Sequence, residues 1–253
     1  MTDALTRFSS RAEAYAKYRP DYPPGVLDIL KSECGLTLNS IVADVGSGTG
    51  ILTELLLKNG NRVFGVEPNE SMRVIAEDLL NNYPQFVSVD GSAEATTLAE
   101  NSVGIIVAAQ AFHWFDRDKT KREFRRILKS DGWVVLIWNE RRLDSSPFLR
   151  EYENLLLRCG TDYHEVRHEN VAAKLAEFFA PDEYKVVNLD NFQHFDFAAL
   201  QGRVASASYT PEPGHPNFKA MAEGLQAIFD AHSIDGRVTF EYDTRVYYGH
   251  LGK

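Results

Sequence analysis

Short apolar runs alternate with longer amphipathic stretches over the first half of the chain. Apolar runs that end at polar or glycine positions are typical of buried strands, whereas apolar residues three or four positions apart indicate helices. Strands are expected near residues 41–45, 62–66, 86–89, 103–109 and 133–138. Helices are expected near 50–59, 70–81 and 117–129, after an earlier helix that Pro23 and Pro24 open. This alternation predicts a doubly wound, mostly parallel sheet of the α/β class, and right-handed crossovers restrict its topology.

The pattern changes after residue 139. Helices are expected near 147–159, 164–179, 197–206 and 216–232, with strands near 184–189 and 238–248. The last strand alternates apolar and polar residues, as a half-buried strand does. The sequence contains no internal repeat and no low-complexity linker. We therefore expect one domain over residues 1–253.

A glycine-rich turn follows the first predicted strand, in the run IVADVGSGTG over residues 41–50. Gly46, Gly48 and Gly50 allow backbone conformations and close approaches that a Cβ would forbid, so a ligand can sit against main-chain N–H groups at the start of the next helix. A dinucleotide fingerprint would need its third glycine where Ile51 stands. Asp44 would repel a pyrophosphate, but it suits a cationic or amine-bearing ligand. The pattern indicates S-adenosylmethionine.

The second predicted strand ends in another acid, Glu67. A carboxylate at this strand end is suited to accept both ribose hydroxyls of a nucleoside. Pro68 then breaks the strand, and Asn69 is expected to cap the next helix. Met72 lies in its first turn, where its thioether could lie on an adenine ring or simply fill the core.

Four segments together resemble the motifs of the class I S-adenosylmethionine-dependent methyltransferases, in the order that the family has them. They are residues 44–50, 66–69, 90–94 and 123–132. The chain departs from the family at Gly104, where an aspartate is usual. The resemblance implies a seven-stranded sheet whose last two strands form an antiparallel pair. It implies cofactor contacts from Tyr15, Arg19, Asp44, Gly46, Ser47, Gly48, Glu67, Pro68, Met72, Ser92, Ala93, Glu94 and Gln110.

Further segments at residues 15–23, 108–116, 137–139 and 206–211 resemble one subgroup of that family. The subgroup includes enzymes similar to trans-aconitate and cantharidin methyltransferases, which act on small carboxylates or related compounds. The resemblance implies a core of about residues 36–140 with strands at 184–192 and 237–250. It also implies a helical lid built from residues 1–22, 141–180 and 195–215.

The acceptor site is expected beyond the fourth and fifth strands, because ligands of such sheets bind at the carboxyl ends of the strands. His113 follows the fourth strand and is the candidate catalytic base, with a core histidine as the equal alternative. Candidate substrate contacts are Trp114, Trp138, Asn139, Arg141 and Tyr209. Several have plainer alternatives: packing for Trp114 and Tyr209, and a solvated charge for Arg19 and Arg141.

The leading hypothesis is oxygen methylation of a small, carboxylic-acid metabolite. A carboxylate is ionised near neutral pH and needs no general base. One alternative is methylation of a hydroxyl or amine with His113 as base. Another is a non-catalytic protein that binds S-adenosylmethionine, for which the sequence offers no positive sign.

Charge and composition narrow the partners to a small molecule. Acidic residues number 36 against 27 basic ones, which gives a net charge of −9. A nucleic-acid substrate is not expected, because the one basic run, 119–126, fits the wet face of a helix. No stretch is long enough for a membrane span, no metal spacing occurs, and no obligate protein partner is evident. Two distant cysteines suit a reduced, cytoplasmic setting.

Overall fold

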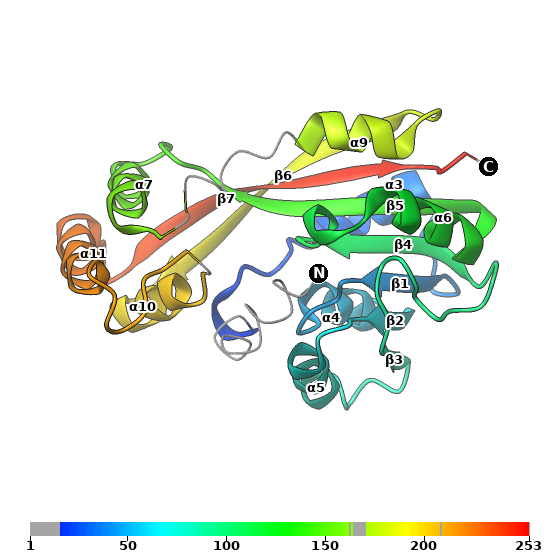
Figure 1. The fold of residues 1–253 in the computed structure, drawn as a ribbon, viewed down its shortest axis with the longest axis horizontal. Helices are drawn as coiled ribbons and strands as arrows, with labels where there is room; N and C mark the ends of the chain where they lie inside the picture. The colour runs from blue at the N-terminus through cyan, green and yellow to red at the C-terminus, as the bar shows by residue number, and fades with distance from the viewer. Residues whose placement is uncertain (1–15, 162, 164–170, 208, 253) are drawn as a thin grey trace.

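The computed structural model describes residues 16–161, 163, 171–207 and 209–252. Its strands form one seven-stranded sheet in the order β3-β2-β1-β4-β5-β7-β6 (Figure 1). The first five strands in that order run parallel to their neighbours, while β7 runs antiparallel to both β5 and β6. The predicted α/β class with a doubly wound, mostly parallel sheet is confirmed. The antiparallel pair at the end of the sheet is present as expected.

The first four strands have the predicted bounds, β5 and β6 are longer than predicted, and β7 ends one residue beyond the predicted 238–248. The strands are β1 Ile41–Val45, β2 Arg62–Val66, β3 Phe86–Val89, β4 Val103–Ala109, β5 Leu128–Arg141, β6 Tyr184–Phe195 and β7 Val238–Gly249. Side chains of β6 alternate between half-buried and exposed, and all twelve of its residues pair with β7. The second half of β6 carries mostly polar residues, so its sequence does not indicate a half-buried strand. It is a strand because it pairs with β7.

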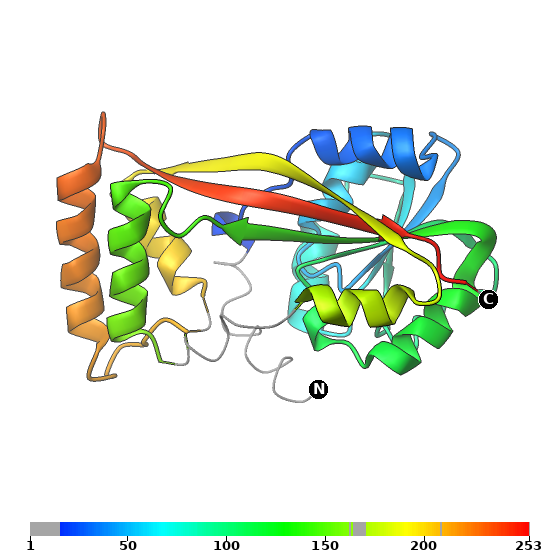
Figure 2. The same ribbon diagram turned by 90° about the horizontal axis from the view of Figure 1, so that it is seen from above.

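Helices cover both faces of the sheet (Figure 2). They are α3 Gly25–Cys34, α4 Ile51–Lys58, α5 Glu70–Leu79, α6 Arg117–Ile127, α7 Pro147–Cys159, α9 Val171–Phe179, α10 Phe197–Ala205 and α11 Phe218–His232, with a 3₁₀ turn η1 at Phe112–Trp114. Alternate residues of β4 feed the two cores: Ile105 and Val107 face α3 and α4, whereas Ile106 and Ala108 face α6 and α9. A strand buried on both faces reads as a continuous apolar run, which is why β4 was recognisable in the sequence.

The helices α7, α10 and α11 form a separate helical lobe with the far halves of β6 and β7 (Figure 1). Its core holds Tyr152, Leu200, Leu225 and Phe240, all buried. The chain crosses between the sheet core and this lobe through the long strands β5, β6 and β7. Backbone hydrogen bonds between these strands therefore continue from one part into the other and hold the two parts in a fixed arrangement.

The helical lobe differs from the predicted lid in two helices. Helix α9, which the prediction placed in the lid, packs on the core sheet: the ring centroids of Phe178 and Phe112 are 4.8 Å apart. Helix α11 was left outside the lid, yet it packs closely on α7, because Gly224 lets Leu155 approach to within 2.6 Å of where a Cβ would stand. Amphipathic patterns predicted both helices without showing which surface each would cover. Residues 1–15 and 164–170 of the predicted lid lie outside the described residues.

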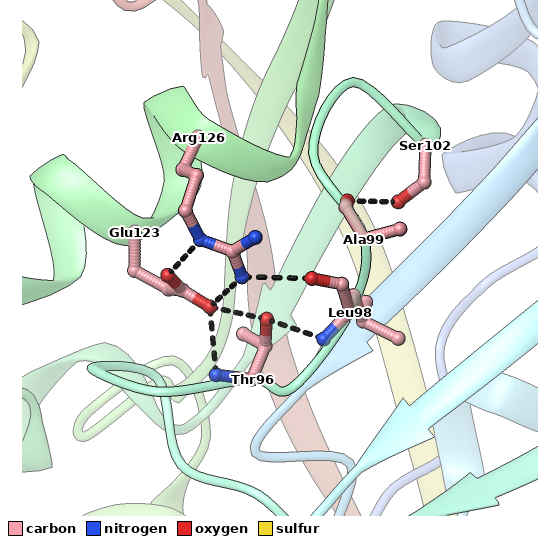
Figure 3. Close-up of polar contacts among 6 residues, drawn as sticks. All are labelled: Thr96, Leu98, Ala99, Ser102, Glu123 and Arg126. Carbon is pink, nitrogen blue, oxygen red and sulfur yellow. Dashed lines mark hydrogen bonds and ion pairs between the residues drawn. The ribbon is translucent and has the colours of Figure 1, made fainter.

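An ion pair between the buried Glu123 and the half-buried Arg126 fixes the loop between β3 and β4 (Figure 3). Glu123 Oε1 accepts hydrogen bonds from the backbone N–H of Thr96 at 2.8 Å and from its hydroxyl at 2.5 Å. Arg126 donates to both carboxylate oxygens of Glu123 at 2.7 Å and to the carbonyl of Leu98 at 2.8 Å. The Arg126 guanidinium, with the Thr96 bonds, lowers the pKa of Glu123 to about 2. The α6 helix thus holds the loop that contains residues 92–94.

We expect Glu123→Gln to lower the free energy of unfolding by about 2 kcal/mol, since a charged acceptor of several hydrogen bonds is lost. Urea unfolding at pH 7 measures it, with the exposed Glu177→Gln on α9 as the matched control. The lowered pKa sets the sign of the pH effect: the stabilisation is full above the ordinary pKa and fades as pH falls toward about 2. The difference between wild type and variant should shrink over that interval. Equal stability of the two proteins at pH 7 would contradict this role.

Candidate functional site

A pocket opens at the carboxyl ends of β1, β2 and β4, the edge at which the sequence places a ligand. Predicted cofactor contacts that line it are Asp44, Gly46, Ser47, Gly48, Glu67, Pro68, Met72, Ser92, Ala93, Glu94 and Gln110. Trp114, a predicted substrate contact, lines it as well. The structure therefore gathers these predicted residues from four separated segments of the chain around one cavity.

The glycine turn between β1 and α4 leaves the backbone bare toward the pocket. Gly46 and Gly48 have φ angles of +71° and +58°, a region that side-chain-bearing residues rarely occupy. A Cβ on Gly46 would stand 2.6 Å from the Cβ of Ala111, so only glycine lets the loop after β4 come this close. A Cβ on Gly48 would meet only the Met72 sulfur, at 3.7 Å. Gly48 therefore presents its main chain to a ligand beside Met72.

Glu67 joins this turn to the end of β2. Its Oε2 accepts a hydrogen bond from the N–H of Gly48 at 2.9 Å, and its Oε1 accepts one from the N–H of Asn69 at 2.8 Å. Burial raises the pKa of Glu67, while the two backbone donors oppose that rise. An ionised carboxylate has about four acceptor positions, so lone pairs remain for two further donors. Asn69 also caps α5, as predicted, by accepting from the N–H of Met72 at 3.2 Å.

Asp44 is a buried carboxylate with an incomplete set of partners. The hydroxyl of Thr53 donates to its Oδ2 at 2.6 Å. Its Oδ1 is buried and has no hydrogen-bond partner among the described residues. Burial raises the pKa of Asp44 to about 7, with the Thr53 bond opposing. A buried oxygen in this state favours a cationic group or a hydrogen-bond donor from a ligand.

The end of β4 is held in a strained conformation next to the pocket. Gln110 has a φ of +54°, which is uncommon for a residue other than glycine. Its N–H donates to the carbonyl of Ile137 at 2.9 Å, and its side-chain amide donates to the carbonyl of Asn139 at 3.0 Å. The two bonds tie the pocket wall to β5. Strain that is held in place by neighbours is typical of functional sites.

Comparison with known proteins relates the segment that forms most of this pocket to a protein family. Residues 43–136 match the model of a family described as a methyltransferase domain. Within residues 43–136 the chain is therefore similar to a methyltransferase domain. Uncharacterized methyltransferases of Mycobacterium tuberculosis and Schizosaccharomyces pombe are 37% and 31% identical to the chain, over 62% and 69% of it and over 62% and 66% of their own lengths.

A solved structure supports the same fold. A protein of Anaeromyxobacter dehalogenans assigned as a type II methyltransferase superposes with a TM-score of 0.70 at 22% identity, covering 92% of this chain and 98% of its own. The chain spans about 62% of the length of the curated Mycobacterium relatives that it matches. The cofactor of the methyltransferase domain is S-adenosylmethionine.

The residues of the methyltransferase domain fit this cofactor by their own chemistry. Asp44 offers an unpartnered carboxylate oxygen for the positive end, and Glu67 keeps acceptor positions for the ribose hydroxyls. Met72, Ser92 and Ala93 line the same pocket and give it apolar surface beside the two acids. The cavity thus combines an acidic end with an apolar wall, as an adenosyl sulfonium requires.

Other predicted site residues lie outside the lining of this pocket. Arg19 donates to the carbonyl of Ser206 at 3.2 Å, and Tyr15 lies outside the described residues. Asn139 donates to the carbonyl of Asp21 at 3.3 Å and accepts from the hydroxyl of Thr244 at 2.5 Å. These bonds use both ends of its amide within the protein. Asn139 thus anchors the N-terminal segment, and its predicted substrate contact stays a prediction.

Trp138, Arg141 and Tyr209 are also away from the pocket lining. Trp138 is buried in the core beneath α6 and α9, where its ring stands 5.7 Å from that of Tyr247. Arg141 is an ion-pair partner inside the helical lobe, and the ring of Tyr209 packs in the same lobe at 4.9 Å from Tyr163. Side chains at 138 and 139 point to opposite faces of β5, so a single strand end could not deliver both to one site.

His113 is exposed on the 3₁₀ turn η1 and does not line the pocket. Its ring centroid lies 4.8 Å from that of Trp114, which does line the pocket. The neighbouring Phe112 is buried in the core. The turn thus buries Phe112, whereas His113 and Trp114 are both exposed and lie side by side.

Sequence reasoning missed several residues of the pocket. They are Tyr22, Thr49, Ile51, Leu52, Asn69 as a lining residue, Ala109, Ala111 and Phe115. It also missed Thr53, which holds Asp44 from the first turns of α4. The one indication of Thr53 in the sequence was its polar side chain within the mostly apolar run Ile51–Leu57. Nothing in the sequence indicated Tyr22, because its position depends on how residues 16–22 fold back over the sheet.

None of the helices among the described residues is long and apolar enough to cross a membrane. The described residues also contain no group of three or more His, Cys, Asp or Glu side chains placed to hold a metal ion.

The raised pKa of Asp44 predicts a pH-dependent effect of Asp44→Asn. The folded wild type keeps a proton that the unfolded chain releases between the ordinary pKa of 3.8 and about 7. Its stability therefore falls as pH rises through that window, by at most about 1.4 kcal/mol per pH unit. Asparagine binds no proton, so from pH 5 to pH 8 the variant should gain about 1–3 kcal/mol relative to wild type.

Urea unfolding at both pH values tests this, with the exposed Asp78→Asn on α5 as the control. Calorimetry should show that the same Asp44→Asn variant binds S-adenosylmethionine more weakly, because the charge facing the sulfonium is gone. Parallel stability curves for wild type and Asp44→Asn would mean that Asp44 has an ordinary pKa.

Proposed function

We propose that the protein transfers the methyl group of S-adenosylmethionine to a carboxylate oxygen of a small metabolite. The support is the methyltransferase domain, the chemistry of its pocket, and the resemblance of residues 15–23, 108–116, 137–139 and 206–211 to enzymes similar to trans-aconitate and cantharidin methyltransferases.

The observation that carries the carboxylate proposal is the set of side chains around the pocket. The lining contains the acids Asp44, Glu67 and Glu94, and it contains no histidine or lysine among the described residues. Glu94 accepts from the N–H of Asp116 at 2.8 Å, and Glu67 and Asp44 are held as described above. An acceptor that is ionised already at neutral pH needs no base. A carboxylate meets that condition, whereas a hydroxyl does not.

The reaction balances without a proton transfer. S-adenosylmethionine supplies an electrophilic methyl group on a sulfonium. A lone pair of the acceptor oxygen forms the new O–C bond while the S–C bond breaks, and its electrons neutralise the sulfonium. The products are a methyl ester and S-adenosylhomocysteine. The protein has to align the two reactants, which in well-oriented models supplies up to roughly 7–11 kcal/mol.

The residues near β4 are placed to give that alignment. Gln110 is fixed by two hydrogen bonds at the pocket wall, and the rings of Tyr22, Trp114 and Phe115 complete the lining on that side. These groups orient an acceptor and exclude water without reacting themselves.

We extend the proposal to the whole chain, as one domain in which residues 16–22 and the helical lobe cover the acceptor side of the pocket. Tyr22 lines the pocket, while the carbonyl of Asp21 accepts from Asn191 at 2.7 Å and Arg19 reaches α10 through Ser206. The segment therefore contacts both the cofactor site and the lobe.

Methylation of a hydroxyl or amine with His113 as base receives less support from the geometry. His113 is exposed and stands outside the lining, so a proton on an acceptor in the pocket is not next to it. The non-catalytic alternative has no support in the site either, because the glycine turn, Asp44 and Glu67 are all intact.

Incubation with methyl-labelled cofactor and a panel of small acids, their amides and matching alcohols tests the proposal. We expect label in an ester that mild alkali releases, and none in the amides. His113→Ala should change turnover by less than about threefold, like the exposed control His215→Ala, because a general base typically contributes about 10²–10⁴-fold.

Two results would refute the carboxylate proposal. One is label confined to an amine or a ring carbon. The other is a loss of more than about a hundredfold in His113→Ala that recovers at high pH, as removal of a base predicts.

A further inference from the structure

The helical lobe holds a cluster of buried charged and phenolic groups that the proposed reaction has not yet used. We call it the lobe arginine cluster, and it consists of Arg141, Tyr152, Glu153, Tyr163 and Arg203. Arg141 ends β5, α7 carries Tyr152 and Glu153, and α10 carries Arg203. Its groups sit among the apolar core of the lobe.

Arg141 is engaged on one side only. Its Nη2 donates to Glu153 Oε2 at 2.5 Å and to the Tyr163 hydroxyl at 2.9 Å, and that hydroxyl donates to the same Glu153 oxygen at 2.5 Å. The guanidinium carbon stands 4.9 Å from the ring centroid of Tyr152. Its Nη1 is buried and has no hydrogen-bond partner among the described residues. One donor face of Arg141 is thus left over.

Arg203 is a buried cation without a countercharge in the described part of the chain. It is 5% exposed, and its Nε and Nη1 lack hydrogen-bond partners there. Its guanidinium carbon lies 6.0 Å from the ring centroid of Phe240. Tyr152 and Tyr209 interact electrostatically with both Arg203 and Arg141, so the two arginines surround the same pair of phenols.

Four unsatisfied atoms of the cluster are able to donate: Arg141 Nη1, Arg203 Nε, Arg203 Nη1 and the hydroxyl of Tyr152. The oxygen Glu153 Oε1 is an acceptor, and it does not bind any of these four donors. Two guanidinium charges still face one described carboxylate, that of Glu153. Burial of an uncompensated cation costs stability, and an arginine remains protonated under all ordinary conditions. A ligand that only accepts and carries negative charge can pair with all four donors.

We propose that the lobe arginine cluster binds a carboxylate of the methyl acceptor, one that is not itself methylated. A planar carboxylate matches the forked donors of arginine in both charge and geometry. This inference rests on the proposed function and adds to it the position of the acceptor's anchoring group. It assigns Arg203 and Tyr152 as binding residues, together with the free side of Arg141.

Strand β5 links the cluster to the wall of the cofactor pocket. Gln110, which lines the pocket, donates to the carbonyl of Asn139, and Arg141 follows two residues later on the same face of β5. A strand advances about 3.3 Å per residue, so Arg141 begins roughly 7 Å further along. An acceptor anchored there and reacting at the pocket needs two acidic groups. The acceptor class is therefore a dicarboxylate or a larger polyacid, and the product is its monomethyl ester.

The first test measures binding without turnover. Thermal unfolding of the full chain without cofactor is followed in about 10 mM succinate, in the same concentration of its uncharged diamide, and in sodium chloride of equal ionic strength. Succinate should raise Tm by about 2–4 °C and the other two should not, because a ligand that binds the folded state stabilises it. No difference between succinate and sodium chloride overturns the proposal.

The second test locates the site with Arg203→Met and the matched Arg158→Met, which changes an exposed arginine on α7. Arg203→Met should lose the succinate response and, without succinate, unfold at or above the wild-type temperature, because a buried unpaired charge is gone. Arg158→Met should behave as wild type. An Arg203→Met protein that keeps the full succinate response contradicts the assignment.

Tyr152→Phe decides the question if Arg203→Met does not fold. It removes one unpartnered hydroxyl and should weaken succinate binding about tenfold, the effect of one hydrogen bond to a charged group. Unchanged binding in this variant overturns the proposal. Binding of succinate with no methyl transfer to any acid would refute the proposed reaction and leave the site standing. Equal methylation of monoacids and diacids by wild type, or an Arg203→Met protein that keeps the wild-type preference for diacids, would refute the site and leave the reaction standing.

Discussion

The carboxylate of Glu67 is the constraint on which the cofactor pocket depends. It lies at the end of β2, yet its two oxygens accept from the backbone of the glycine turn after β1 and from the start of α5. Three segments are thereby held at one point, at 2.8–2.9 Å, by a side chain that is 7% exposed. Because the acceptor is charged and the donors are main-chain N–H groups, the geometry of the turn does not depend on side-chain rotamers. The rest of the pocket is arranged around this junction.

The helical lobe and the pocket that Glu67 organises differ in charge. The pocket end is acidic, through Asp44 and Glu67, and suits a sulfonium and a ribose. The lobe end is basic, through Arg141 and Arg203. Strand β5 connects the two, because the side-chain amide of Gln110 in the pocket wall donates to the carbonyl of Asn139 on this strand. The chain as a whole carries a net charge of −9, yet it buries two arginine side chains together in the lobe.

The sequence predicted the part of the fold in which local pattern and tertiary burial agree. β1 and β4 are largely buried on both faces, so their apolar runs stand out and their bounds were correct. The glycine turn and the acid at the end of β2 were also readable, because their chemistry is concentrated in a few adjacent residues. The cofactor side of the site needed little beyond these segments.

The remainder depended on contacts between distant segments. The outer half of β6 is a strand because β7 lies beside it, and α9 belongs to the core because Phe178 meets Phe112. Asn139 reads as a polar residue at a strand end, but only the folded chain shows that Asp21 and Thr244 occupy its amide. Arg203 looks like an ordinary helical arginine in the sequence. Its burial follows from the packing of α10 on the strands, which no local pattern carries.

Calorimetry of cofactor binding to wild type and Glu67→Gln tests the central claim most directly, with S-adenosylmethionine, S-adenosylhomocysteine and a nicotinamide dinucleotide as ligands. The account predicts that wild type binds both adenosyl compounds and not the dinucleotide, and that Glu67→Gln weakens both by about tenfold or more, equivalent to about 1.4 kcal/mol. Binding of the dinucleotide in their place, or unchanged affinity in Glu67→Gln, would contradict it.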